Sequence, residues 1–375
     1  MNGPLEGIRI VEVGHMLAGP YCGLMLADMG AEVIKIEASE GDIGRTVSPH
    51  FVGPHNAYFA SLNRNKKSVV LDLASEGGRA SLGGIVARSH ALVTNLRPSA
   101  IKKLGLTYDA LQRFNERLVC VALTGYGLDG PYSENPAYDY VIQAMTGVMA
   151  LTGDPSSPPT KAGYSAVDNS AGLVAALGLL AKIVQGRGGQ VDVSMYDVML
   201  SQLNYLAGAQ LNAGESIERM PASSHPYVVP AQIFPTQDGW LTLFITHDKF
   251  WKKFCGEIGR PEWTVDPSFA SMAGRRKHRT EVVAAITGVL ANATAAEWVR
   301  RLAPLGVVAA EVGTLADALQ SDIAAERGLV VQLGNGELPL RALASPVRFD
   351  GYLPSYGLPP LLDEHRDEVL GWASA

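Results

Sequence analysis

The sequence is poor in cysteine and lacks the motifs that would use it. Only Cys22, Cys120 and Cys255 occur in 375 residues, and no two of them form a Cys-x-x-Cys pair. We therefore expect neither a disulfide framework nor a zinc site, because both need cysteines in pairs or clusters. A reducing compartment is the default for such a chain, so we predict a cytoplasmic protein that holds no metal.

Concentrated positive charge is also missing. The formal net charge is −6, charged residues make up 18% of the chain, and no basic run or tail occurs. Nucleic acids and membrane surfaces attract proteins through such concentrations, so we expect neither as a partner. No basic-then-apolar leader opens the chain, and the apolar run 173–184 is too short to span a membrane.

Strands and helices alternate through the first 125 residues. A strand at 8–13, a helix at 21–29 and a strand at 31–37 form a βαβ unit, which predicts an α/β fold with a parallel sheet. Gly14 does not open a G-x-G-x-x-G motif, so we expect no nicotinamide or flavin cofactor. Ligands of such sheets bind at the carboxyl ends of the strands. Those ends are expected in the loops 14–20, 38–45, 72–75, 95–98 and 124–131.

Two polar features have more than one interpretation. Arg64, Lys66 and Lys67 precede a strand expected at 69–73; they form either a solvated turn or a phosphate contact beside the sheet. Asp168 stands before a long apolar helix and among small residues such as Gly163. It is either a helix N-cap or a nucleophile that the positive helix end keeps ionised, and position alone leaves both open.

Motifs along nearly the whole chain resemble CoA-transferase family III, also called the CaiB/BaiF family. Each motif is weak by itself, but their order and spacing together are specific. They lie at 4–11, 18–20, 26–37, 63–73, 95–98, 125–131, 138–140, 152–153, 168 and its helix, 189–194 and 359–365.

The resemblance implies an α/β fold with a Rossmann-like large domain, a parallel sheet and a smaller inserted α/β domain. Two chains would form an interlocked homodimer. The expected boundaries are 1–200 for the first part of the large domain and 201–230 for a linker helix and active-site loop. The small domain would cover 231–320, and 321–375 would return to the large domain.

The resemblance also implies an enzyme that moves CoA from an acyl-CoA donor to a small carboxylic acid. Asp168 would be the nucleophile, forming first an aspartyl mixed anhydride and then an aspartyl-CoA thioester. Coenzyme A would be a substrate, without metal or redox cofactor. Matching the family's formyl-CoA:oxalate CoA-transferases, CoA contacts are expected at Leu17, Ala18, Leu71, Asp72, Leu73, Ala74, Asn95, Leu96, Arg97, Lys103 and Tyr138. Ala38 departs from that pattern, which has an arginine there, so a phosphate contact is lost or supplied elsewhere.

Alternatives remain for single residues and for the activity. Leu17, Leu71 and Leu73 could be plain core, and Lys103 a solvated helix residue. Related α-methylacyl-CoA racemases use a histidine 30 residues before the aspartate, but that position here is Tyr138, a poor base at neutral pH. A non-catalytic CoA-binding protein is the third possibility, against which the complete set of motifs speaks.

Overall fold

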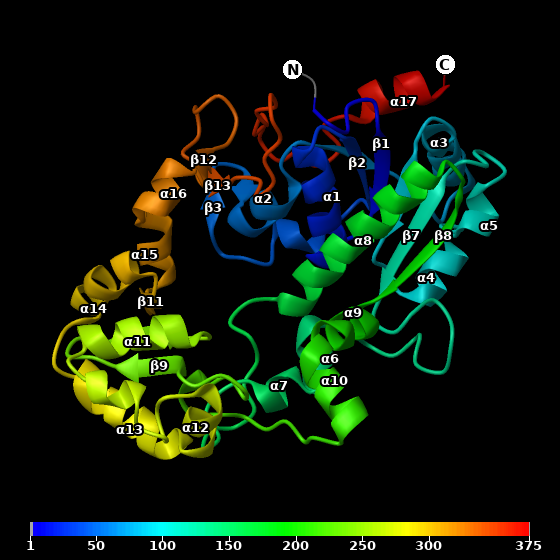
Figure 1. Ribbon diagram of the computed structural model, residues 1–375. Coiled ribbons are helices and arrows are strands. Elements are labelled where there is room, and N and C mark those ends of the chain that lie inside the picture. Colours follow the sequence, from blue (N-terminus) through cyan, green and yellow to red (C-terminus); the bar gives the residue numbers. More distant parts are fainter. Residues whose placement is uncertain (1–2, 375) are drawn as a thin grey trace. The chain divides into compact units, whose positions relative to one another are not determined.

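The computed structural model describes residues 3–374, and these fall into two compact units, each treated by itself (Figure 1). Unit 1 holds the residues up to Thr146, Gly163–Asn204 and the residues from Leu319 on. Unit 2 holds Gly147–Ala162 and Tyr205–Ala318. The chain therefore leaves unit 1 twice and returns to it twice.

Unit 1 is built on a six-stranded sheet in the order β5-β2-β1-β6-β7-β8, in which every neighbouring pair is parallel. Counted along the chain, this is the order 3-2-1-4-5-6 of a Rossmann-like fold, with its reversal between β1 and β6. The predicted α/β class and parallel sheet are confirmed. The strands are β1 Arg9–Val13, β2 Glu32–Glu37, β5 Lys66–Val70, β6 Ala91–Thr94, β7 Val119–Thr124 and β8 Gly189–Ser194.

Alternate strand residues point to opposite faces, and one face packs on the helices that follow the strands. Val11, Val13, Ile34 and Ile36 are buried there in a single apolar core. Strands covered on both faces need apolar side chains throughout, which explains their near-continuous hydrophobic runs. The helices of this core are α3 Glu76–Ala87, α4 Pro98–Lys103, α5 Tyr108–Leu111 and α17 Arg366–Ser374.

The opposite face carries helices α1 (Ala18–Asp28) and α8 (Ala166–Gln185), which lie against each other (Figure 1). A Cβ on Gly172 would lie 2.7 Å from the Ala18 carbonyl oxygen, so only glycine permits this close approach. Helix α8 has 20 residues and is long and apolar enough to cross a membrane, in contrast to the shorter run expected from the sequence. It packs in unit 1 through small residues, a property that core helices share.

Buried ion pairs lie beneath the α1 face of the sheet. Glu12 of β1 accepts hydrogen bonds from Lys35 at 2.9 Å and from Lys66 at 2.7 Å. Lys66 thus belongs to β5, which begins three residues before the strand expected there. The phosphate contact considered for the basic segment is wrong, because each of its three cations is paired with a carboxylate of the protein. Arg64 pairs with Asp28, Lys66 with Glu12, and Lys67 with Glu32 and Glu368.

Unit 2 contains the antiparallel sheet β11-β10-β9, whose hairpin turns at Thr236–Gly239. Its own core gathers large aromatic side chains, among them Trp251, Phe254 and Trp298. The elements are β9 Ala231–Pro235, β10 Trp240–Phe244, β11 Val308–Glu311, α7 Val148–Leu151, α11 Asp248–Glu257, α12 Met272–Lys277, α13 Arg279–Leu290 and α14 Ala295–Leu302.

Several helix boundaries differ from the sequence-based expectation. The sequence pattern predicts one helix at 138–150, but the chain breaks it at Gly147, whose φ of +85° is left-handed. The sequence pattern also predicts a last helix at 361–372. That helix begins at Arg366, because Asp363 adopts a φ of +62° and accepts a hydrogen bond from the Val70 N–H. The remaining elements are β3 Phe51–Val52, β4 His55–Asn56, β12 Val330–Gln332, β13 Arg341–Leu343, α2 Ala57–Asn63, α6 Asp139–Met145, α9 Met195–Gln202, α10 Asn204–Ala213, α15 Leu315–Gln320 and α16 Asp322–Glu326.

Candidate active site

Asp168 lies inside the first turn of α8 and is not its N-cap, so the cap interpretation is wrong. The N-cap is Ser165, which makes Asp168 the third residue of the helix. Asp139 of α6 supplies the capping contact instead. Its carboxylate accepts hydrogen bonds from the Val167 N–H at 2.8 Å and from the Gln143 amide at 2.6 Å. The contact that a first-turn carboxylate often makes with a free backbone N–H of its helix is therefore made by Asp139 and not by Asp168.

The protonation of Asp168 also differs from the sequence-based expectation. Burial raises its pKa, the negative charge of Asp139 raises it further, and together they bring it to about 7. The positive helix end was expected to keep Asp168 ionised, but its pKa is raised and not lowered. Asp139 already occupies the helix N-terminus with an anion, so a second carboxylate there meets repulsion as well as lost hydration. Such a perturbed carboxylate is a typical feature of a functional site.

Tyr58 of α2 is a neighbour that the sequence did not reveal. Burial raises the pKa of Tyr58 to about 12, and the negative charges of Asp168 and Asp42 add to the effect. Tyr58 therefore lies within electrostatic reach of both carboxylates and keeps its proton at any physiological pH. Helix α2 has no strong periodic pattern, so only the tertiary structure brings this tyrosine to Asp168.

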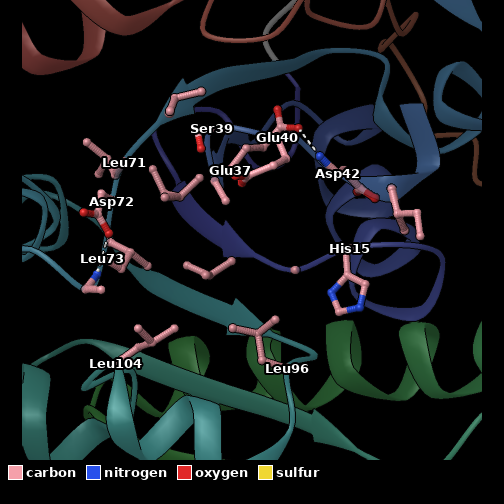
Figure 2. A pocket seen from close by; sticks show the side chains of 18 residues that line it. His15, Glu37, Ser39, Glu40, Asp42, Leu71, Asp72, Leu73, Leu96 and Leu104 are labelled. Atoms are coloured by element: carbon pink, nitrogen blue, oxygen red, sulfur yellow. Dashed lines mark hydrogen bonds between the residues drawn. The ribbon is translucent and has the colours of Figure 1, made fainter. Parts of the chain in front are cut away.

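A cavity of about 580 Å³ opens at the carboxyl ends of β1, β2 and β5, where the strand order predicts a ligand site. Five of the expected CoA-binding residues line it: Leu71, Asp72, Leu73, Ala74 and Leu96. Leu71 and Leu73 are at the same time part of the hydrophobic core, and their contact with CoA stays a prediction. Figure 2 shows Leu71, Asp72 and Leu73 on one side, His15 and Asp42 on the other, and Leu96 and Leu104 below.

Asn95 does not line this cavity and has a different task. Its side-chain oxygen accepts from the His15 N–H at 3.0 Å, and its amide donates to the His15 carbonyl at 2.9 Å. A Cβ on Gly14 would lie 2.3 Å from the same side-chain oxygen, which explains a glycine there. Asn95 thus fixes the loop after β1, and both its side-chain oxygen and its amide nitrogen are hydrogen-bonded to His15.

The same loop is held from two further sides. Lys35 donates to the Gly14 carbonyl at 2.9 Å, and Asp42 accepts from the Met16 N–H at 3.1 Å. These contacts support Met16 in a left-handed conformation, with a φ of +64° that costs a non-glycine residue free energy. The expected CoA contacts Leu17 and Ala18 follow directly, at the start of α1, and they lie outside the cavity lining.

The three remaining expected residues are exposed. Arg97 is the N-cap of α4 and Lys103 its last residue, and each adjoins a residue of the cavity wall, Leu96 and Leu104. Tyr138 is the N-cap of α6 and immediately precedes Asp139, so it belongs to the surroundings of Asp168 rather than to the cavity.

The cavity wall is acidic and contains no lysine or arginine among its 18 residues. Two of its acids are already neutralised. The Glu37 carboxylate accepts hydrogen bonds from the Arg45 Nε at 2.8 Å and the Arg45 Nη2 at 2.7 Å, and Asp42 pairs with Lys35 at 2.8 Å. These cations lower the pKa of both carboxyls, although burial alone would raise it. Within residues 3–374, no group of three or more His, Cys, Asp or Glu side chains is placed to hold a metal ion.

Comparison with known proteins decides the family. The model of "CoA-transferase family III" matches residues 5–366. The chain belongs to this family. Its relatives include an acetyl-CoA:oxalate CoA-transferase from Acetobacter aceti, 34% identical over 97% of this chain and 94% of that protein. A succinate–glutarate CoA-transferase from Agrobacterium fabrum is 31% identical over 98% and 95%.

Solved structures of the family agree with the fold. A CaiB/BaiF family protein from Brucella suis has a TM-score of 0.86 and 31% identity, with 100% of both chains covered. The protein is thus an enzyme of the CoA-transferase type, and transfer of CoA between an acyl-CoA and a carboxylate is the activity that the family supports. The racemase and the non-catalytic alternatives find no support among these relatives.

Proposed function

We propose that the enzyme transfers CoA by two displacements at Asp168. The ionised carboxylate attacks the acyl-CoA carbonyl, the C–S bond breaks, and a mixed anhydride and CoA thiolate form. The thiolate attacks the aspartyl carbonyl, which releases the donor acid and leaves an aspartyl-CoA thioester. The acceptor carboxylate then reverses these steps, releasing the new acyl-CoA and free Asp168.

The environment of Asp168 is the observation that carries this proposal. Burial beside Asp139 raises the free energy of the ionised Asp168 carboxylate, and the raised pKa of Asp168 reflects this. Both the anhydride and the thioester are neutral at this position, so each covalent step relieves that cost. Asp139 holds the start of α8 in place through Val167, which keeps the attacking oxygen at a fixed position.

CoA itself needs cations, since it carries phosphates and the cavity wall offers none. We assign this task to side chains at the cavity rim: Arg97 and Lys103 of α4, and Arg79 of α3. Arg79 donates from one terminal nitrogen to the carbonyls of Ala74 (2.5 Å) and Leu73 (3.3 Å), both of which are wall residues. Its guanidinium is therefore fixed next to the wall, and it can supply a cation that Ala38 does not.

The homodimer, the cytoplasmic location and the carboxylic acid substrate belong to the same proposal. Helix α8 exposes large apolar side chains, 68% of Leu177 and 86% of Val184, which a second copy of the chain would cover. The three cysteines are free and buried, as a reducing compartment permits. Oxalate, succinate and glutarate occur in the names of the relatives, so small dicarboxylic acids are the first acceptors to test.

A crossed screen tests the function. The purified enzyme is incubated with each of several acyl-CoA donors and dicarboxylic acids, and new acyl-CoA species are detected by mass spectrometry. At least one pair should give product with the wild type and none with Asp168→Asn. Product formation by the Asp168→Asn enzyme would refute the assigned nucleophile, and α-proton exchange without any transfer would refute the transferase proposal.

A further inference from the structure

A second cavity, of about 420 Å³, lies at the amino edge of the unit 1 sheet, opposite to the edge of the acidic cavity. His90 stands just before strand β6, and Asn115 and Arg117 stand before β7. The other wall residues come from the C-terminal ends of α3 and α8 and the residues that follow them. Nothing in the proposed transfer reaction uses it. Its wall is formed by Ala87, Arg88, Ser89, His90, Asn115, Arg117, Lys182, Ile183, Gly186 and Arg187.

This wall has four cationic side chains and no carboxylate. Within residues 3–374, no ion pair is formed by Arg88, Arg117, Lys182 or Arg187. The chain as a whole is acidic, with a net charge of −6, so this gathering is not a general surface property. Helix C-termini favour a cation, which explains Arg88 and Lys182 but not the other two. Four like charges around one cavity repel one another, and a polyanion among them would relieve that repulsion and be attracted by all four.

The backbone that carries these cations is fixed. The Arg9 guanidinium donates to the Arg88 carbonyl at 3.1 Å, and the Arg117 N–H donates to the Asn115 side-chain oxygen at 3.0 Å. The loop with Arg187 is pinned by Gly188, where a Cβ would lie 2.2 Å from the Glu116 carbonyl oxygen. The cationic side chains therefore start from set positions around the cavity, as in a pre-formed site.

The neutral polar groups of the wall are already engaged. Asn115 donates to the Ser89 carbonyl at 2.7 Å, and the Ser89 hydroxyl donates to the Ile85 carbonyl at 2.8 Å. His90 accepts from the Arg9 N–H at 3.0 Å. Burial lowers the pKa of His90, and the charges of Arg9 and Arg117 lower it further, as expected in a positive field. Lys182 donates one hydrogen bond to the Gln185 side chain at 2.7 Å and has two further donors. The cations are thus the main groups of the wall that can bind a ligand.

We propose that this cavity binds a small molecule carrying a pyrophosphate or a longer phosphate chain, such as a nucleoside di- or triphosphate. Each of the three guanidinium groups can donate hydrogen bonds to two phosphate oxygens, and the lysine adds a further positive charge. A single carboxylate is too small and too weakly charged to engage four cations. A phosphate chain extends over several of them and matches their total charge.

Calorimetric titration of the full-length enzyme with sodium pyrophosphate, and separately with ATP, tests this site. The double variant Arg117→Gln/Arg187→Gln should weaken binding of both by at least 10-fold, while the control Arg300→Gln, an exposed arginine of unit 2, should change nothing. Increasing salt should weaken binding in the wild type. The single variant Arg88→Gln gives the same comparison if the double variant fails to fold.

The acidic cavity supplies the discriminating control. Lys103→Ala should leave pyrophosphate binding unchanged, whatever it does to acyl-CoA. CoA is titrated as a further ligand, because it carries a pyrophosphate of its own. If the wild type binds more than one CoA per chain and the double variant binds only one, CoA itself is a ligand of this second cavity. Absence of pyrophosphate and ATP binding at millimolar concentration would overturn the proposal. So would binding that is equal in wild type and double variant, or that is lost in Lys103→Ala.

Discussion

Replacing Asp168 with asparagine should abolish transfer and at the same time stabilise the folded protein at pH 8. Asparagine keeps the size of the side chain but removes the charge that burial and Asp139 disfavour. An amide cannot form the anhydride, so activity is lost for a chemical reason and not through unfolding. An ordinary first-turn carboxylate would behave in the opposite way, since its charge is favourable at a helix N-terminus.

The pKa of Asp168 sets the size of the effect. The folded-state pKa of about 7 exceeds the ordinary value of 3.8, so the folded protein binds this proton more tightly than the unfolded chain. Stability from this residue is present below pH 4 and is lost as the pH rises to 7. At about 1.4 kcal/mol for each pH unit, the upper limit is ~4 kcal/mol, and partial solvent access reduces it to about 2 kcal/mol.

Denaturant unfolding at one protein concentration, at pH 8 and again at pH 4, measures this difference. Asp168→Asn should be about 2 kcal/mol more stable than wild type at pH 8, and the two should converge at pH 4. Asp197→Asn is the matched control, because Asp197 is likewise the third residue of its helix, α9, but exposed. The Asp197→Asn protein should have an unfolding free energy ~0.5 kcal/mol lower than wild type at pH 8, because it loses a favourable charge at a helix N-terminus. An Asp168→Asn protein no more stable than wild type at pH 8 would refute the reasoning.

Two further predictions concern the reaction, and a third concerns the stability of the loop after β1. Turnover should fall about tenfold for each pH unit below 7, because only ionised Asp168 attacks; a pH profile flat from 5 to 8 would contradict the raised pKa. Arg79→Ala and Lys103→Ala should each raise KM for acyl-CoA several-fold with little change in kcat, as steady-state kinetics would show; an unchanged KM in both would remove them from CoA binding. Asn95→Ala should free the His15 backbone and lower the unfolding free energy by about 1 kcal/mol in denaturant titrations, because water can reach the groups it leaves. No loss would mean that the loop is held without Asn95.

The sequence predicted the parallel sheet well, because each strand and each intervening helix has its own local pattern. It misplaced β5, since Lys66 and Lys67 look like a solvated turn. Lys66 is buried only because Glu12, 54 residues earlier, neutralises it. No local pattern contains such a pair, so the buried ion pairs beneath the sheet could not be predicted.

The candidate site was predicted to a similar extent. Family resemblance drew attention to Asp168 and to the wall residues Leu71–Leu73, and position relative to the strands indicated the cavity. The raised pKa of Asp168 could not be foreseen, because it depends on Asp139, which stands at another helix end and takes the capping contact. Tyr58 is similar, since only the folded chain brings it within reach of Asp168.

The most direct test of the account is to trap the covalent enzyme. Wild-type enzyme is incubated with an acyl-CoA donor, quenched with hydroxylamine or borohydride, digested, and its peptides are identified by mass spectrometry. A modification confined to Asp168, dependent on acyl-CoA and absent in Asp168→Asn, is the predicted result. Transfer with an unmodified Asp168, or modification of another residue, would contradict the assignment of Asp168 as the nucleophile.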